Sequence, residues 1–204
     1  MAKGPSRNNL ASVGVIILAA GSSRRIGRPK QLLDLEGKPL LQHVIDAAEA
    51  AGVDEIFLVL GHMADAIAAA VTLPRNARVV VNPDHATGQA SSLRVGLEAL
   101  GGGIDRAVVV LGDQPRVRSE AIRAVAAAAR PIARAVYAGE PSHPVAFDRS
   151  TWEELSSVVG DQGARALLAA RAAQVCAVEL GGAPPADVDT EAEYLRVRGA
   201  LGAG

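Results

Sequence analysis

Short apolar runs alternate four times with helix-patterned segments in the first two thirds of the chain, and this alternation constrains the fold more than any other feature. Each run is continuous, as in a strand buried on both faces of a parallel sheet. The predicted strands are residues 13–20, 55–61, 77–82 and 106–113. The predicted helices are residues 39–52, 63–71, 89–101 and 119–129. The pattern predicts an α/β fold with right-handed crossovers and helices on both faces of the sheet.

The pattern changes after residue 130. Residues 133–139 and 143–147 are predicted to form two antiparallel strands joined by a tight turn at 140–142. The remaining predicted elements are two helices, a strand and a closing helix, at residues 150–159, 163–173, 174–180 and 190–201. We therefore expect a single domain over residues 13–201 with a small antiparallel insertion, preceded by a flexible tail at residues 1–12.

Composition narrows the classes of function. The 204 residues carry a formal net charge of −1 and 2% aromatic residues, which disfavours nucleic-acid binding through a basic field or stacking. The one cysteine, Cys176, excludes an intrachain disulfide and a cysteine-based zinc site, and its strand-like surroundings predict a buried core thiol. The first residues lack the apolar core of a signal peptide, and the longest apolar run is too short to span a bilayer. We expect a cytoplasmic protein without membrane contact.

The segment LAAGSSRRIGRPKQLL, residues 18–33, follows the first predicted strand. Ligands of open α/β sheets bind at the carboxyl ends of strands, which is where this loop begins. Gly21 allows backbone amides to approach an anion closely, and Arg25 and Lys30 supply charge suited to phosphate oxygens. Ser22 and Ser23 add hydroxyl donors. The spacing matches neither a P-loop nor a dinucleotide fingerprint. Both a phosphate-binding loop and a solvated basic turn fit it, and the chemistry favours phosphate.

Acidic residues follow two later segments. Asp113 closes the segment 106–113, straight after its apolar run and a glycine. A carboxylate at this place can hold a divalent metal or cap the turn that follows. Asp187 and Asp189 stand two positions apart before the last helix and face the same way if the chain is extended. One of them can cap the helix and the other can supply a second carboxylate. A basic loop with two separated acidic positions is the equipment of Mg²⁺-dependent phosphoryl or nucleotidyl transfer.

Six segments, taken together and in order, resemble the MobA/MocA-type nucleotidyltransferases, and most closely the molybdenum cofactor cytidylyltransferase branch. The segments are LAAGSSRRIGRPKQLL, GQASSLRVGL, VVLGDQP, SHPVAF, GDQGARALL and DVDTEAEY. The resemblance covers about residues 13 to 198. It implies a Rossmann-like three-layer α/β sandwich that transfers a nucleoside monophosphate from a nucleoside triphosphate to a phosphate acceptor, with Mg²⁺ and release of pyrophosphate.

The resemblance also implies site residues. Lys30 would contact the phosphates and stabilise the transition state together with Arg25, and Asp113 would hold Mg²⁺. The second metal ligand would be Asp189 or Asp187, and Asp189 is preferred. The residues implied to bind the nucleotide are Ala19, Ala20, Gly21, Ser22, Ser23 and Arg25, with Gly88 and Ser92 at the base and ribose.

Base and acceptor follow less directly. The guanylyl branch carries glycine where this chain has Ala20. The methyl group of Ala20 would crowd a purine, which favours CTP over the larger GTP. The acceptor implied is the terminal phosphate of molybdopterin, with a molybdoenzyme or its chaperone as a possible protein partner. His143 would line the acceptor side or be a surface-strand histidine. Arg165 would hold an acceptor phosphate or pair with Asp161 one helical turn away.

Three alternatives stay open at this point. An enzyme of the same fold can use GTP in place of CTP. It can also use a sugar or polyol phosphate as the acceptor. A non-catalytic chaperone that binds the molybdenum cofactor needs the pocket but not the metal-binding carboxylates.

Overall fold

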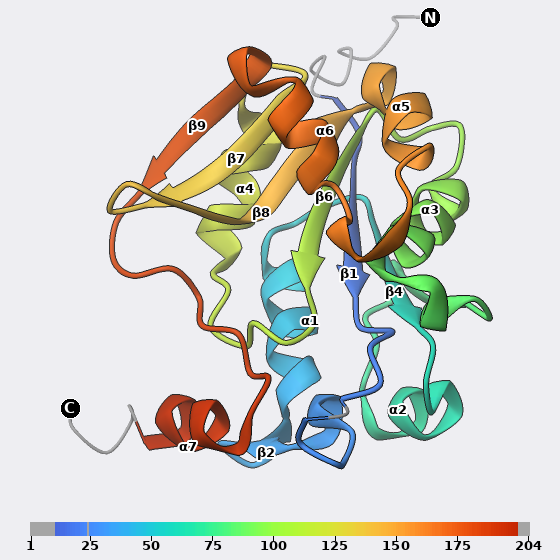
Figure 1. Cartoon of the computed structure of the whole chain (residues 1–204), viewed down its shortest axis with the longest axis vertical. Helices are drawn as coiled ribbons and strands as arrows, with labels where there is room; N and C mark the ends of the chain where they lie inside the picture. Colours follow the sequence, from blue (N-terminus) through green and yellow to red (C-terminus); the bar gives the residue numbers. More distant parts are fainter. Residues whose placement is uncertain (1–10, 24, 200–204) are drawn as a thin grey trace, which may run out of the picture.

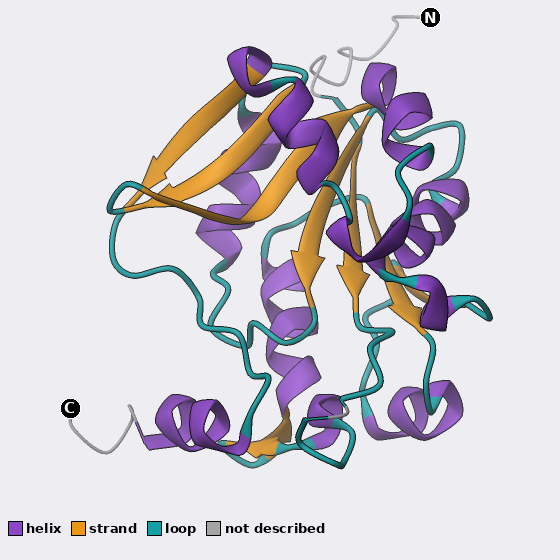
Figure 2. Ribbon diagram, viewed as in Figure 1, coloured by secondary structure: helices purple, strands orange, loops and turns teal. Residues whose placement is uncertain are grey.

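The computed structural model describes residues 11–23 and 25–199, which form a seven-stranded mixed sheet with helices on both faces (Figures 1 and 2). The strand order is β5-β4-β1-β6-β8-β7-β9. Most of the predicted tail and the end of the predicted last helix lie outside the described residues. Within the described ranges, no helix has the length and apolar character needed to cross a bilayer.

The first half of the sheet is parallel, as the alternating pattern predicts. Its strands are β1 (Val13–Leu18), β4 (Glu55–Leu60), β5 (Ala77–Val81) and β6 (Arg106–Leu111). β1 lies between β4 and β6, with Ile16 opposite Phe57 on one side and Val109 on the other. Side chains of β1 are buried toward both faces because helices cover both, which explains the continuous apolar run.

Two helical layers enclose the sheet. The core on one face includes residues of α1 (Leu40–Ala50), α2 (Ala64–Ala70) and α4 (Ser119–Ala127). The core on the other includes residues of α3 (Gln89–Ala99), α5 (Trp152–Ser156) and α6 (Arg165–Ala170). α3 approaches β1 closely at Gly96, where a β-carbon would lie 2.5 Å from a methyl carbon of Ile16. This close packing fixes the start of α3 relative to the end of β1.

The antiparallel part of the sheet consists of β8 (Glu140–Asp148), which pairs with β6 on one side and β7 (Ile132–Tyr137) on the other. The predicted turn at 140–142 is wrong. The chain turns at Ala138 and Gly139, which both have positive φ, and residues 140–142 already belong to β8. Glycine adopts such a φ without strain, so the turn forms there and shifts the start of the strand.

β9 (Val175–Leu180) pairs with β7 in parallel and forms the edge of the sheet. Cys176 lies on this strand and is only partly buried, against the core that contains α1 and α4. The prediction of a core thiol is therefore right about its packing but wrong about full burial.

A small hairpin and the last helix form a satellite that the sequence patterns did not predict as a unit. β2 (Asp34–Leu35) pairs with β3 (Lys38–Pro39), and α7 (Glu191–Gly199) packs beside them (Figure 1). The hydroxyl of Tyr194 donates a hydrogen bond of 2.6 Å to the carbonyl of Asp34. The apolar residues shared by this satellite are Leu33, Leu35, Leu40, Val188, Tyr194 and Val197. This packing brings residues 187–190 beside the loop that follows β1.

Candidate active site

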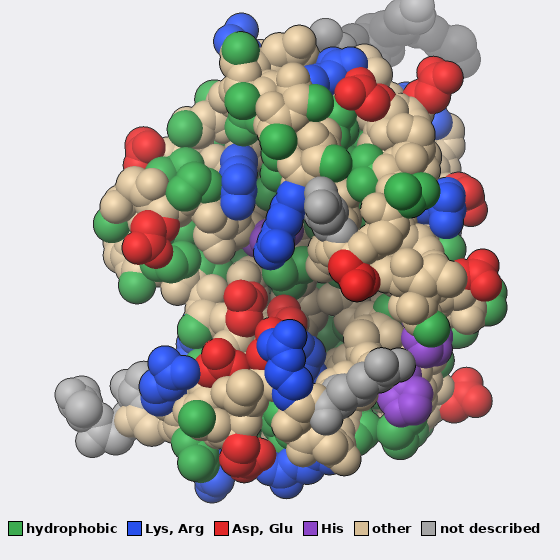
Figure 3. Space-filling model, viewed as in Figure 1, with side chains coloured by type: hydrophobic (Ala, Val, Ile, Leu, Met, Phe, Trp, Pro, Cys, Tyr) green, Lys and Arg blue, Asp and Glu red, His purple; other side chains and the backbone are tan. Residues whose placement is uncertain are grey.

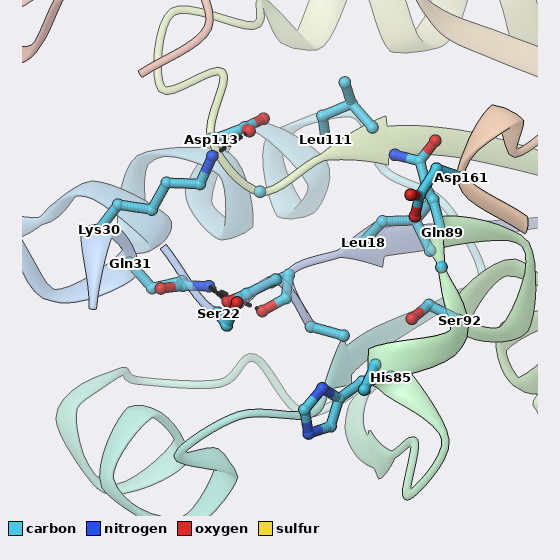
Figure 4. A pocket seen from close by; sticks show the side chains of 16 residues that line it. Leu18, Ser22, Lys30, Gln31, His85, Gln89, Ser92, Leu111, Asp113 and Asp161 are labelled. Carbon is cyan, nitrogen blue, oxygen red and sulfur yellow. Dashed lines mark hydrogen bonds and ion pairs between the residues drawn. The ribbon is translucent and has the colours of Figure 1, made fainter. Parts of the chain in front are cut away.

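A pocket of about 390 Å³ opens at the carboxyl ends of β1 and β6, where the sheet topology predicts a ligand site (Figure 4). Lys30 and Asp113 lie toward one end of it, and Gln89, Ser92 and His85 toward the other. The sequence-predicted residues that line this pocket are Ala19, Ala20, Gly21, Ser22, Lys30, Gly88, Ser92 and Asp113. The structure therefore brings together residues from three separate segments of the chain.

The loop after β1 is held from behind by a buried glutamine. The amide of Gln31 donates hydrogen bonds to the carbonyls of Ala19 (2.9 Å) and Gly21 (3.2 Å), and only 2% of the residue is exposed. The hydroxyl of Ser23 accepts from the backbone N–H of Lys30 at 3.1 Å and lies outside the pocket lining. Ser23 thus holds the loop in shape. Sequence reasoning missed Gln31, whose only signal is a polar residue before two leucines.

The start of α3 forms the opposite wall. Gly88 has a φ of +119°, and a β-carbon there would lie 2.5 Å from the backbone of Gly160, so this position requires glycine. Asn82, which is buried, donates hydrogen bonds to the hydroxyls of Ser91 (2.8 Å) and Ser92 (2.9 Å). These bonds orient Ser92 at the edge of the pocket. Asn82 was not singled out from the sequence, because a polar residue after a strand has many structural uses.

Lys30 joins the two acidic segments. Its Nζ lies 2.6 Å from Oδ2 of Asp113 and 2.6 Å from Oδ1 of Asp189. Burial acts to lower the pKa of Lys30, but the two carboxylates outweigh it and the pKa is raised. The hydrogen bond from Lys30 is the main cause of the lowered pKa of Asp189. Arg25 adds an ion pair of 3.1 Å to Asp189 from a side chain that is 73% exposed.

Two buried side-chain oxygens beside this centre lack a hydrogen-bond partner in the described chain, Oε1 of Gln114 and Oδ1 of Asp113. Oδ1 of Asp113 is buried and makes no hydrogen bond within the described part of the chain. A buried carboxylate oxygen without a donor is costly unless a cation or a ligand group satisfies it. The donor chemistry fits a hard divalent cation, for which carboxylate oxygens are the preferred protein ligands.

Asp187 takes a different position from Asp189. Its carboxylate accepts a hydrogen bond of 2.9 Å from the amide of Gln114. Burial is the main cause of its raised pKa, and the neighbouring carboxylates of Asp113 and Asp189 add to it. The carboxylate of Asp189, by contrast, contacts Lys30 and Arg25.

Neither aspartate caps α7, so the option that one of them caps this helix is wrong. Oε2 of Glu193 instead accepts from the backbone N–H groups of Asp189 (2.9 Å) and Thr190 (2.8 Å). The N–H of Glu193 donates to the hydroxyl of Thr190 at 3.2 Å. This reciprocal capping box leaves the carboxylate of Asp189 available to the site.

The described residues contain no group of three or more His, Cys, Asp and Glu side chains that could enclose a metal ion. Mg²⁺ bound to nucleotides characteristically uses one or two carboxylates together with phosphate oxygens and water. Asp113 and Asp189 are the two carboxylates that Lys30 connects, so the site matches this donor set rather than an all-protein cage.

Two further predicted positions lie outside the pocket lining. His143 is on β8, half-buried, with its pKa lowered to about 4 by desolvation and by the charges of Arg134 and Arg165. Asp161 lines the pocket, whereas Arg165 forms no ion pair with it within the described ranges. The predicted Asp161–Arg165 pair at one-turn spacing is therefore absent.

The fold and the site define an α/β protein in which basic residues of the loop after β1 contact the carboxylates of Asp113 and Asp189. Residues 15–175 match the model of the MobA-like NTP transferase domain, so the chain belongs to the MobA-like NTP transferase family. This agrees with the family resemblance inferred from the six sequence segments.

The chain is similar to known proteins whose names indicate different activities. The chain is 33% identical to nicotine blue oxidoreductase of Paenarthrobacter nicotinovorans over 171 residues, covering 78% of this chain and 83% of that protein. It is 38% identical to the bifunctional protein GlmU of Nitratidesulfovibrio vulgaris over 115 residues, which cover 55% of this chain and 25% of GlmU. The chain therefore corresponds to only a quarter of the GlmU relative.

Solved structures extend the likeness to almost the whole chain. Rv0371c of Mycobacterium tuberculosis is 35% identical, with a TM-score of 0.85 over 93% of this chain and 98% of that one. A second structure of Rv0371c, in complex with manganese, is 32% identical with a TM-score of 0.79 and covers 93% and 99% of the two chains. A relative of this fold thus binds a divalent metal ion.

Proposed function

We propose that this protein is a Mg²⁺-dependent nucleotidyltransferase that transfers CMP from CTP to the terminal phosphate of a molybdopterin-type acceptor and releases pyrophosphate. The observation that carries the proposal is the unpartnered Oδ1 of Asp113, beside the Lys30–Asp189 contact and inside the pocket.

The nucleotide occupies the pocket with its phosphates at the Lys30 end and its base near Ala20 and Ser92. Gly21 and Ser22 offer backbone and hydroxyl donors to the phosphates. The methyl group of Ala20, which is 6% exposed, limits the space for the base and favours cytosine over guanine.

Asp113 and Asp189 are the residues that would hold Mg²⁺. When bound, the ion supplies charge neutralisation for the triphosphate and the leaving pyrophosphate. The manganese complex of Rv0371c supports a divalent ion in this fold. The ammonium group of Lys30 lies between the two carboxylates. It can therefore reach the phosphates of a nucleotide whose metal ion is held by Asp113 and Asp189.

The transfer needs no general base. An oxygen of the acceptor phosphate, already ionised near neutral pH, forms a bond to the α-phosphorus of CTP. The bond from the α-phosphorus to the oxygen that bridges to the β-phosphate breaks, and pyrophosphate leaves with that electron pair. Lys30 and Arg25 stabilise the negative charge that increases on these oxygens.

The identity of the acceptor rests on the sequence resemblance to the molybdenum cofactor cytidylyltransferases. A sugar or polyol phosphate, and GTP in place of CTP, are the alternatives within the same fold. A molybdenum cofactor chaperone would not require the carboxylates of Asp113 and Asp189. The name of the relative from Paenarthrobacter nicotinovorans adds an oxidoreductase to the activities that a test should include.

A pyrophosphate-release screen tests the proposal. Each of the four nucleoside triphosphates is incubated with Mg²⁺ and molybdopterin, with a sugar phosphate, or without acceptor, and the reduction of nicotine blue by a reduced nicotinamide cofactor is followed in parallel. The expected result is release of pyrophosphate with CTP and molybdopterin only. Release with a sugar phosphate alone would overturn the acceptor, and reduction of nicotine blue without pyrophosphate release would overturn the reaction class.

A further inference from the structure

Three side chains that the nucleotide pocket does not use share one face of the sheet, beside α6. Arg134 on β7 lies two positions after Ile132, and His143 on β8 lies two positions before Val145; both Ile132 and Val145 belong to the core under α3, α5 and α6. Arg165 is the first residue of α6, which covers the same face. The guanidinium of Arg134 donates hydrogen bonds to the carbonyls of Ser142 and Pro141, directly before His143, and the charges of Arg134 and Arg165 both lower the pKa of His143.

This basic cluster, Arg134, His143 and Arg165, has no counter-charge. Neither arginine has a carboxylate within ion-pair distance in the described ranges of the chain. Arg134 donates only to the carbonyls of Ser142 (3.4 Å) and Pro141 (3.1 Å), which leaves part of its guanidinium uncommitted. Glu179 on β9, next to β7, is exposed and pairs with neither arginine.

Two arginines held near each other without an acid repel one another. Burial lowers the pKa of Arg134, and the charge of Arg165 lowers it further. Bringing these side chains together therefore costs free energy that an anion between them would recover, since a guanidinium binds phosphate or carboxylate oxygens through two parallel hydrogen bonds.

The basic cluster borders the reaction centre. Val145 pairs with Val109 on β6, and because the strands are antiparallel, the chain from Val145 back to His143 runs toward the carboxyl end of β6. Asp161, which lies four positions before Arg165 in the chain, lines the nucleotide pocket. Figure 3 shows Lys and Arg side chains above a hollow on this face and Asp and Glu side chains gathered below it.

We propose that Arg134, His143 and Arg165 form the binding site for the phosphate group of the acceptor, on the β7–β8 side of the Lys30–Asp113 centre. The identification of the ligand as the acceptor rests on the proposed function, whereas the anion site itself rests on the basic cluster. The class of ligand is a phosphate monoester, whose two negative charges match two guanidinium groups. His143 is uncharged near neutral pH and serves as a hydrogen-bonding partner, since its pKa is about 4.

Histidine resonances provide separate reporters for the two sites. The chain has four histidines, of which His85 lines the nucleotide pocket and His143 belongs to the basic cluster. Protein labelled with ¹³C at histidine Cε1 is titrated with inorganic phosphate at pH 7 without Mg²⁺, and the signals are assigned with His→Gln variants. The His143 signal should shift saturably, and Arg134→Gln and Arg165→Gln should each weaken phosphate binding about tenfold.

Arg78→Gln is the matched control, because Arg78 lies on β5 with a side chain that is 71% exposed. It should leave the phosphate affinity unchanged. Arg165 is exposed, so its variant keeps the test valid if Arg134→Gln fails to fold. An unmoved His143 signal, or equal affinity in wild type and Arg165→Gln, overturns the anion site.

A second titration separates this result from the proposed function. CTP with Mg²⁺ should move the His85 signal in wild type and in Arg165→Gln alike. If His85 responds to CTP and His143 does not respond to phosphate, the anion site is wrong while the nucleotide pocket stands. If His143 responds to phosphate and His85 ignores every nucleoside triphosphate, the anion site stands and the nucleotidyltransferase proposal fails.

Discussion

The ammonium of Lys30 and the carboxylate of Asp113, 83 positions apart in the chain, meet at 2.6 Å with side chains that are only 12% and 21% exposed. Partial shielding from water strengthens this pair relative to a surface salt bridge. Lys30 engages only Oδ2 of the carboxylate, and Oδ1 remains without a partner in the described chain. The pair thus combines a neutralised charge with a carboxylate oxygen that has no hydrogen-bond partner among the described residues.

Asp113→Asn should abolish nucleotidyl transfer and preserve the fold. The amide retains the shape of the side chain but removes the negative charge that would hold the metal ion of the metal–triphosphate complex. We expect kcat/KM for pyrophosphate release to fall about a hundredfold or more. Circular dichroism and thermal unfolding check the fold, and Tm should shift by no more than a few degrees, about 1 kcal/mol of stability. Transfer at the wild-type rate would remove Asp113 from the mechanism.

Asp189→Asn and Asp187→Asn form a matched pair, two positions apart with identical chemistry. Because Asp189 contacts Lys30 and Arg25 whereas Asp187 contacts Gln114, the first variant should raise the Mg²⁺ concentration for half-maximal activity by about tenfold or more, and the second by about threefold or less. The measurement is activity over a Mg²⁺ titration at saturating CTP. The reverse order would make Asp187 the second metal ligand.

The parallel half of the fold could be predicted from the sequence because its strands are buried on both faces and therefore appear as continuous apolar runs. The hairpin β2–β3 could not, because two-residue strands have no periodicity. The turn was predicted at residues 140–142, which include Pro141, a residue frequent in turns. It forms at Ala138 and Gly139, which both have positive φ, a conformation that glycine adopts without strain.

The candidate site divides in a similar way. Residues directly after strands, such as Gly21 and Asp113, could be found because the sheet places strand ends at a common edge. The different positions of Asp187 and Asp189 could not, because they depend on the capping box between Thr190 and Glu193. That box is visible as a Thr and a Glu three residues apart, and it is the signal that the sequence analysis passed over.

Ala20→Gly should relax the preference for CTP. Removing the methyl group from this buried pocket residue makes room for a larger base, so the ratio of kcat/KM for CTP to that for GTP should fall about tenfold, the effect of one methyl-sized change in a pocket. Steady-state pyrophosphate release with each nucleotide measures the ratio.

Ala86→Gly is the control for Ala20→Gly, since Ala86 also lines the pocket but lies on a different segment. It should leave the ratio unchanged within about twofold. An unchanged ratio in Ala20→Gly would mean that the base is selected elsewhere in the pocket.

Stability should fall between pH 6.5 and pH 4 in a way that depends on His143. Its pKa is about 4 in the folded protein and 6.5 as a free side chain, so the unfolded state binds a proton in this range that the folded state excludes. As pH falls below 6.5, protonation of His143 increasingly favours the unfolded state. The resulting loss of unfolding free energy reaches its limit of about 3 kcal/mol below pH 4. Above pH 6.5 the histidine contributes no pH dependence.

The comparison of wild type with His143→Gln isolates this contribution. Urea unfolding of both proteins at pH 7, 5.5 and 4.5 gives the difference in unfolding free energy at each pH, and the carboxylates that titrate in both proteins cancel. Relative to its value at pH 7, wild type should lose more stability than the variant at the two lower pH values. Inorganic phosphate should reduce the difference, because an anion between Arg134 and Arg165 offsets the charges that keep His143 uncharged. Parallel curves for the two proteins would show that His143 titrates as an ordinary exposed histidine.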